Sequence, residues 1–236
     1  MSSNLIIALD FADPAEALAF AARLDPRQCR VKVGKELFVR GGPAVIEGLH
    51  DKDFEVFLDL KFHDIPNTVA GACRAAADLG VWMVNVHASG GLTMMEAARE
   101  SLAAYRHRPL LIAVTVLTSL TDSDLRQLGI NTPAADMVTR LAGLTRQAGL
   151  DGVVCSAQEA AVLKQQFGND FQLITPGIRL PDAPGDDQRR TLTPAEASQA
   201  GADYLVVGRP VTRAAEPMAV VERIHRDLQV IRPARV

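Results

Sequence analysis

Short apolar runs recur along the chain, and each is followed by a stretch with helix signals. Eight such runs, rich in Val, Leu and Ile, cover residues 5–9, 29–33, 54–60, 82–86, 110–116, 151–155, 171–175 and 203–207. Their apolar positions are nearly continuous instead of alternating with polar ones. Such runs are typical of parallel strands that are covered by helices on both faces of the sheet.

Capping residues and glycines predict where several of the intervening helices begin and end. Residues 13–16 read Asp-Pro-Ala-Glu and residues 193–196 read Thr-Pro-Ala-Glu, so both segments offer a helix N-cap, a proline in the first turn and a glutamate after it. The alanine-rich stretch 70–80 and the stretch 133–149 each end on a glycine, which favours a helix C-terminus there.

Eight strand–helix units in 236 residues predict an α/β fold, namely a single-domain (β/α)8 TIM barrel over residues 1–236. The alternative is a doubly wound open sheet. The sequence has no GxGxxG motif after the first run and no Walker loop, so it lacks the motifs that would favour that alternative. The one long irregular connection is 176–194, which we expect to be a functional lid or a disordered stretch.

Composition narrows the classes of function. Hydrophobic residues make up 48% of the chain, enough for a large core, and the net charge of -3 argues against a general binder of nucleic acid or of anionic membranes. The three cysteines are far apart in sequence, which indicates a reduced, cytoplasmic protein. The chain shows neither a signal peptide at residue 1 nor an apolar stretch long enough to span a membrane.

Polar residues follow the predicted strands at their carboxyl ends, where barrels of this kind carry their working sites. These residues are Asp10, Lys32, Asp59, Lys61, His87, Thr118, Ser119, Gly177, Arg179, Gly208 and Arg209. Any one of them could be polar only because the end of its strand is exposed to solvent. Two acids and two lysines on the first three strands, which are adjacent in a barrel, indicate a shared site instead.

The end of the last strand has the chemistry of an anion site. Gly208 lets the backbone approach an anion, and the guanidinium of Arg209 adds a fork of donors. Because the last loops of such barrels often hold phosphate, we expect a phosphate there, with Arg179 and Gln188 of the long connection closing over it.

The sequence does not predict a metal site. Asp59, His63, Asp64 and His87 include ligand types, but Lys61 stands between the two acids and would repel a divalent cation. Ordinary packing or hydrogen bonding is the favoured interpretation of both histidines. The sequence also lacks the HExxH motif of zinc proteases and the GxSxG motif of serine hydrolases.

The motifs taken together resemble those of the orotidine 5′-phosphate decarboxylases in their bacterial form. The most specific block is DLKFHDIPNT at 59–68, and the others are ALDF, KVG, LTS, PGIR and VGRP after further strands. The resemblance covers residues 5–213, nearly the whole chain. It implies a lyase of pyrimidine biosynthesis that converts orotidine 5′-monophosphate to UMP and carbon dioxide without a metal or organic cofactor.

The same resemblance implies a role for each matching residue. It assigns proton donation to Lys61, a place beside the substrate carboxylate to Asp59, and ribose contacts to Asp10 and Lys32. It also implies a homodimer in which two further residues complete the partner's site. The remaining implied assignments are Asp64 and Thr68 to the partner's site, Thr118 to the pyrimidine, and Arg179, Gln188, Gly208 and Arg209 to the phosphate.

Two rival interpretations stay open at this stage. The first is a magnesium-dependent enzyme resembling 3-keto-L-gulonate 6-phosphate decarboxylase or hexulose phosphate synthase, which share the Asp-x-Lys-x-x-Asp pattern. Those enzymes bind the ion partly through a glutamate at the end of the second strand, where this chain has Lys32. The second rival is a non-catalytic nucleotide-binding barrel, which would need the phosphate residues without the charged set around Lys61.

Overall fold

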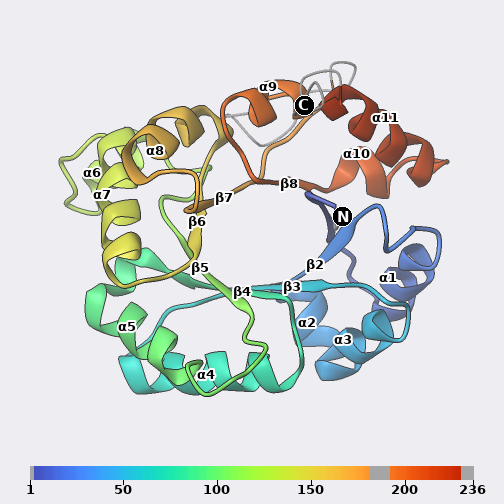
Figure 1. Ribbon diagram of the computed structural model, residues 1–236, viewed down its shortest axis with the longest axis horizontal. Helices are drawn as coiled ribbons and strands as arrows, with labels where there is room; N and C mark the ends of the chain where they lie inside the picture. The colour runs from blue at the N-terminus through green and yellow to red at the C-terminus, as the bar shows by residue number, and fades with distance from the viewer. Residues whose placement is uncertain (1–2, 181–191, 230–236) are drawn as a thin grey trace.

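The computed structural model describes residues 3–180 and 192–229, and in these ranges eight parallel strands close into a barrel (Figure 1). Each strand pairs with the next in chain order, and β8 closes the barrel against β1. Each of the eight predicted runs overlaps a strand, so the predicted (β/α)8 fold is confirmed. The strands are β1 Leu5–Leu9, β2 Arg30–Gly34, β3 Val56–Phe62, β4 Met83–His87, β5 Leu110–Val114, β6 Gly152–Val154, β7 Gln172–Thr175 and β8 Tyr204–Val207.

Helices surround the barrel on its outer face (Figure 1). The cap predicted at Asp13 is present, because its carboxylate accepts a hydrogen bond from the Ala15 N–H, and Thr193 forms a full capping box with Glu196. The helices are α1 Pro14–Ala21, α2 Lys35–Gly41, α3 Pro43–His50, α4 Pro66–Asp78, α5 Leu92–Ser101, α6 Asp122–Gln127, α7 Ala134–Gln147, α8 Ala160–Phe167, α9 Pro194–Gln199, α10 Arg209–Thr212 and α11 Pro217–Gln229, with 3-10 turns η1 Ala88–Gly90 and η2 Ala157–Glu159.

The core has two layers because successive side chains of a strand point to opposite faces. On β1, Leu5, Ile7 and Leu9 pack outward in the layer beneath the helices. Ile6 and Ala8 point inward and pack with Phe57 and other interior residues in a second cluster. Both faces of the strands are therefore apolar, which explains the continuous apolar runs in the sequence.

An aromatic and charged plug closes the barrel at the amino ends of the strands. The Arg30 guanidinium lies 4.0 Å from the centroid of the Trp82 ring, and its Nη2 lies 2.7 Å from a carboxylate oxygen of Glu55. Trp82 and Tyr204 stack edge to face with ring centroids 5.2 Å apart and pack against the inner cluster. The interior is thus filled at this end, and the open mouth lies at the carboxyl ends.

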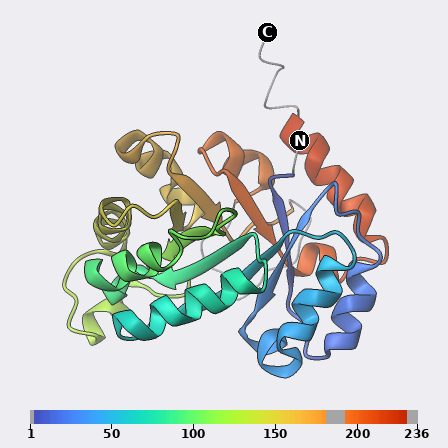
Figure 2. The same cartoon turned by 60° about the horizontal axis from the view of Figure 1, so that its bottom comes forward.

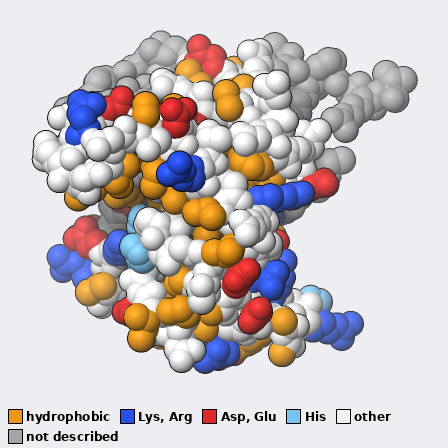
Figure 3. Space-filling view, turned by 90° about the vertical axis from the view of Figure 1, so that its left-hand side faces the viewer, with side chains coloured by type: hydrophobic (Ala, Val, Ile, Leu, Met, Phe, Trp, Pro, Cys, Tyr) orange, Lys and Arg blue, Asp and Glu red, His pale blue; other side chains and the backbone are white. Residues whose placement is uncertain are grey.

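The outer surface of the barrel carries helices and mixed charges. Figure 2 shows that α11 ends near the start of β1, at the end of the barrel opposite the mouth. Basic and acidic side chains are interspersed on the face seen in Figure 3. No helix in the described part of the chain is long and apolar enough to cross a bilayer.

Candidate active site

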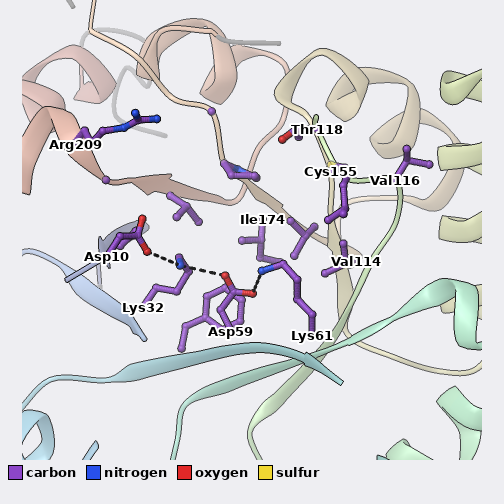
Figure 4. Close-up of a pocket in the computed structure, with 18 of the residues that line it drawn as sticks. Asp10, Lys32, Asp59, Lys61, Val114, Val116, Thr118, Cys155, Ile174 and Arg209 are labelled. Atoms are coloured by element: carbon purple, nitrogen blue, oxygen red, sulfur yellow. Dashed lines mark hydrogen bonds and ion pairs between the residues drawn. The ribbon is translucent and has the colours of Figure 1, made fainter. Parts of the chain in front are cut away.

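Four charged side chains form a row across the mouth of the barrel (Figure 4). Lys32 Nζ lies 3.5 Å from Asp10 Oδ1 and 3.1 Å from Asp59 Oδ2. Lys61 Nζ donates to Asp59 Oδ1 at 2.6 Å. The row therefore alternates in sign, and it confirms the expectation that the ends of the first three strands bring these residues together.

Burial and ion pairing shift the pKa values of Lys32 and Asp59 in opposite directions. Burial by itself would raise the pKa of Asp59, but the ammonium groups of Lys32 and Lys61 outweigh it and hold that pKa below its usual value. Burial would likewise lower the pKa of Lys32, yet Asp59 and Asp10 raise it above its usual value. Both residues are 8% exposed, so they are charged partners in a largely dry environment at neutral pH.

The backbone at Lys61 departs from a regular strand. Pairing between β3 and β4 shifts register between Leu58 and Phe62, which marks a bulge, and Lys61 has a φ of 54°. A non-glycine residue in this left-handed region is uncommon and costs of order 1–3 kcal/mol. Strain of this kind at a residue that carries one of the cavity's two ammonium groups points to a functional constraint on the direction of its side chain.

Asn85 on β4 meets both Asp59 and Lys61. Its Nδ2 donates to Asp59 Oδ1 at 2.7 Å, and its Oδ1 accepts from the Lys61 backbone N–H at 2.8 Å. The residue is fully buried. The sequence does not predict a role for Asn85, because one polar residue within an apolar run is hard to assign. An asparagine in a strand buried on both faces is the only signal.

The predicted phosphate residues lie at the other end of the row. Gly208 is close to Asp10, since a Cβ at Gly208 would lie 3.6 Å from Asp10 Oδ2. Arg209 follows it at the start of α10 and lies on the Asp10 side of the cavity, away from Lys61 (Figure 4). Gly177 at the end of β7 has a φ of 80°, a conformation that glycine adopts without strain, and leads to Arg179.

An apolar wall faces the row of charges. Val114, Val116, Cys155 and Ile174 line the cavity on the side near Lys61 and Thr118 (Figure 4). These residues come from the ends of β5, β6 and β7 and from the segment after β5. Sequence reasoning did not select them, because inward and outward positions of these strands are equally apolar.

The cavity has a volume of about 260 Å³ and joins the two ends of the site. Nine of the predicted rim residues line it: Asp10, Lys32, Asp59, Lys61, Thr118, Gly177, Arg179, Gly208 and Arg209. Gln188 lies outside the described residues, as does most of the predicted lid. A small molecule with an anionic group could therefore place that group near the arginines and its other end between Lys61 and the apolar wall.

Asp64 and Thr68 are not among the residues that line this cavity. Both are exposed, and Asp64 Oδ1 accepts a hydrogen bond from the Ile65 N–H at 2.6 Å. Ile65 itself is 67% exposed. The strand that carries Asp59 and Lys61 into the cavity thus leads into a segment directed to the surface.

The two histidines considered as ligands form a pair beside the row. The rings of His63 and His87 lie 5.3 Å apart between centroids. Burial, with the nearby charges of His63 and Lys35, lowers the pKa of His87 to about 4. Within residues 3–180 and 192–229, no three His, Cys, Asp or Glu side chains are grouped to hold a metal ion.

Comparison with known proteins shows which family has this arrangement. The model of the "Orotidine 5'-phosphate decarboxylase / HUMPS family" matches residues 3–224. The chain belongs to this family. An orotidine 5'-phosphate decarboxylase of Chromobacterium violaceum is 64% identical over 229 residues, which cover 97% of this chain and 93% of the relative. One of Shewanella sediminis is 58% identical over 96% of this chain and 97% of the relative.

Two solved structures agree with the fold. The enzyme of Lactobacillus acidophilus has a TM-score of 0.85 at 39% identity, with 95% of this chain and 98% of that chain covered. An uncharacterized conserved protein from Geobacillus kaustophilus has a TM-score of 0.83 at 42% identity, with 95% and 100% covered. The family resemblance expected from the sequence motifs is therefore confirmed, as is the TIM barrel.

Proposed function

We propose that this protein is an orotidine 5′-phosphate decarboxylase that converts orotidine 5′-monophosphate to UMP and carbon dioxide in pyrimidine biosynthesis. The observation that carries the proposal is the row Lys32–Asp59–Lys61 at the mouth of the barrel, in the same cavity that Arg179 and Arg209 line. The names of the curated relatives support the same activity. The reaction needs no metal ion or organic cofactor in this proposal.

Lys61 is the proton donor in the proposed mechanism. The bond between C6 of the pyrimidine and its carboxylate carbon breaks, both electrons stay on C6, and carbon dioxide leaves. The carbanion on C6 lies in the ring plane and is not delocalised, so a fixed ammonium stabilises it as it forms. Lys61 Nζ then gives a proton to C6, and the neutral amine regains a proton from water.

Asp59 and Lys32 prepare that step. Asp59 pairs with the Lys61 ammonium and directs it into the cavity, and it lies beside the site of the substrate carboxylate, where it disfavours the bound ground state. Lys32 pairs with Asp59 and, with Asp10, contacts the ribose hydroxyls. Ion pairing before substrate arrives means that little reorganisation is needed during the reaction.

The phosphate is bound far from the reacting carbon. Arg179, Gly208 and Arg209 line that end of the cavity, and Thr118 faces the pyrimidine. Gln188 completes the phosphate site in this proposal, although it lies outside the described residues. Binding energy from the phosphate can be used to close the 176–194 connection over the site and expel water, which raises the rate as well as the affinity.

The proposed enzyme is a cytoplasmic homodimer of single-domain chains with two shared active sites. Asp64 and Thr68 reach into the partner's cavity in this assembly. Their exposure and their absence from the lining of their own cavity support such an interface.

The deciding experiment follows orotidine 5′-monophosphate in EDTA-treated protein by the loss of orotate absorbance. We expect conversion to UMP without added metal. Turnover that appears only after magnesium is added would refute the proposal and favour a magnesium-dependent sugar-phosphate enzyme. The ion would then have to bind close to the ammonium of Lys32. Binding of UMP without any turnover would favour the non-catalytic nucleotide-binding barrel.

A further inference from the structure

We propose that Asn85 is a positioning residue of this reaction, because its amide fixes the carboxylate of Asp59 and the backbone of Lys61 relative to each other. The inference rests on the proposed function, and it assigns a role to a residue that is not among the cavity-lining side chains. Asn85 acts through Asp59 and Lys61 and does not touch the substrate.

Both ends of the Asn85 amide are used on these two residues. The Lys61 N–H can only donate, so it fixes which end of the amide is the oxygen. The NH2 group is thereby directed at Asp59 Oδ1, 2.7 Å away. Asn85 is 0% exposed, so water does not compete for either hydrogen bond.

The carboxylate of Asp59 is held from three directions. Asp59 Oδ1 receives Lys61 Nζ at 2.6 Å and Asn85 Nδ2 at 2.7 Å, while Oδ2 faces Lys32 Nζ at 3.1 Å. Two of these donors sit on long, flexible lysine side chains. Asn85 is the short donor among the three, on a strand of the barrel wall, and therefore sets the plane of the carboxylate.

The hydrogen bond from the Lys61 N–H to Asn85 Oδ1 lies where the backbone pairing of β3 with β4 is interrupted. Pairing of β3 with β4 is interrupted between Leu58 and Phe62, and Lys61 lies in this interval with a φ of 54°. The side-chain oxygen of Asn85 takes the N–H of Lys61 in place of a backbone partner. The asparagine thus stabilises the conformation from which the Lys61 side chain enters the cavity.

The test is Asn85→Asp, which keeps the size of the side chain and changes its hydrogen-bonding with pH. In the protonated form, the introduced carboxyl group can donate to Asp59 and accept from the Lys61 N–H, as the amide does. Burial and the adjacent carboxylate raise the pKa of this group. Ionisation at higher pH removes the donor and places a negative charge against Asp59.

We expect kcat of Asn85→Asp to be about 100-fold below wild type at pH 8, a loss typical of a small misplacement of reacting groups. The loss should shrink markedly toward pH 5.5, while the wild type shows no such recovery. The dissociation constant of UMP should change less than about threefold. UMP has no carboxylate at C6 and takes no proton from Lys61, so its binding does not depend on the hydrogen bonds of Asn85. If Asn85 had only a structural role, Asn85→Asp would be less stable than wild type but would not show this pH-dependent loss of kcat.

Thr115→Val is the matched control. Thr115 is a buried polar residue directly after β5, its hydroxyl donates to the Val154 carbonyl at 3.0 Å, and it does not line the cavity. This variant should lose stability and keep wild-type kcat. Asn85→Ser serves as a second variant, since its shorter hydroxyl cannot reach both partners and should lower kcat at all pH values.

Each outcome has one meaning. Wild-type kcat in folded Asn85→Asp or Asn85→Ser would overturn the role of Asn85 while leaving the proposed function intact. Failure of both variants to fold, with Thr115→Val folded, would also overturn it, because Asn85 would then be needed for folding and not for positioning. An inactive wild type would instead refute the proposed function.

Discussion

Replacing Asp59 with Asn tests the charged row at its centre. The substitution keeps the shape of the side chain and removes the negative charge between Lys32 and Lys61. At 3.1 Å and an effective dielectric constant of ~20, the attraction between Asp59 and Lys32 is about 5 kcal/mol before desolvation is subtracted. Removing one partner of a buried ion pair typically costs about 3–5 kcal/mol.

We expect the lower end of that range for Asp59→Asn. Lys32 keeps Asp10 as a partner at 3.5 Å, and the Lys61 side chain is 25% exposed, so neither ammonium is left fully buried and unpaired. A loss of about 3 kcal/mol in the free energy of unfolding corresponds to a fall of about 6–12 °C in Tm for a chain of this size. Turnover of orotidine 5′-monophosphate should fall far more than UMP binding.

The pH dependence gives the sharper test, because its sign follows from the pKa directions. Asp59 has a folded-state pKa below its usual value, so its stabilisation is present above about pH 4 and is lost as pH falls through the lower folded-state pKa. Lys32 has a raised folded-state pKa, so its share is present below about pH 10.5 and is lost as pH rises through the folded-state value. Wild type and Asp59→Asn should therefore differ by a constant amount between these limits and converge below about pH 4.

Urea unfolding across this pH range, with turnover measured in parallel, provides the assay. Asp203→Asn is the matched control, because Asp203 pairs with Lys164 Nζ at 2.6 Å and accepts from the Leu173 N–H, outside the active-site cavity. The control should lose stability and keep wild-type turnover. An Asp59→Asn protein as stable as wild type at pH 7, or a difference that stays undiminished at acid pH, would refute the electrostatic account.

Three further predictions concern neighbouring groups. Lys61→Ala should nearly abolish turnover and leave the dissociation constant of UMP largely unchanged; substantial residual turnover would rule it out as the proton donor. Chains carrying Asp64→Ala or Lys61→Ala, each inactive alone, should regain activity when mixed, because one site of the heterodimer has both groups; confirmed heterodimers without activity would contradict the shared site. Because burial and nearby charges lower the pKa of His87 to about 4, the unfolded chain takes up a proton first and stability should fall as pH drops from about 6.5 to about 4. His87→Gln should flatten that fall in urea midpoints, and an unchanged slope would exclude His87 as its cause.

The fold could be predicted from the sequence because its main signal is local. Each apolar run needs only to be long enough for a strand and bounded by turn or capping residues, and the caps at Asp13 and Thr193 form as their spacing predicts. The placement of Asp10, Lys32, Asp59 and Lys61 then follows from topology, since the carboxyl ends of adjacent parallel strands meet at one rim.

The parts of the site that the sequence did not indicate depend on pairing between strands. Asn85 contacts Lys61 because β3 contains extra residues relative to β4 between two aligned pairs, and no local pattern predicts such a shift. The apolar wall at Val114 and Ile174 was missed for another reason. In a barrel buried on both faces, hydrophobicity does not tell an inward position from an outward one.

The strained backbone conformation of Lys61 and the irregular pairing of β3 with β4 occur at the same place and have the same consequence. A regular strand would continue the hydrogen-bonded ladder through Lys61, whereas the bulge turns its N–H to the Asn85 side chain and its ammonium to Asp59. The interactions that compensate for the strain are therefore the same ones that aim the ammonium group. Since they are complete before any substrate binds, the free protein already holds the ammonium of its proposed proton donor paired with Asp59 in the cavity, so little reorganisation is needed when substrate arrives.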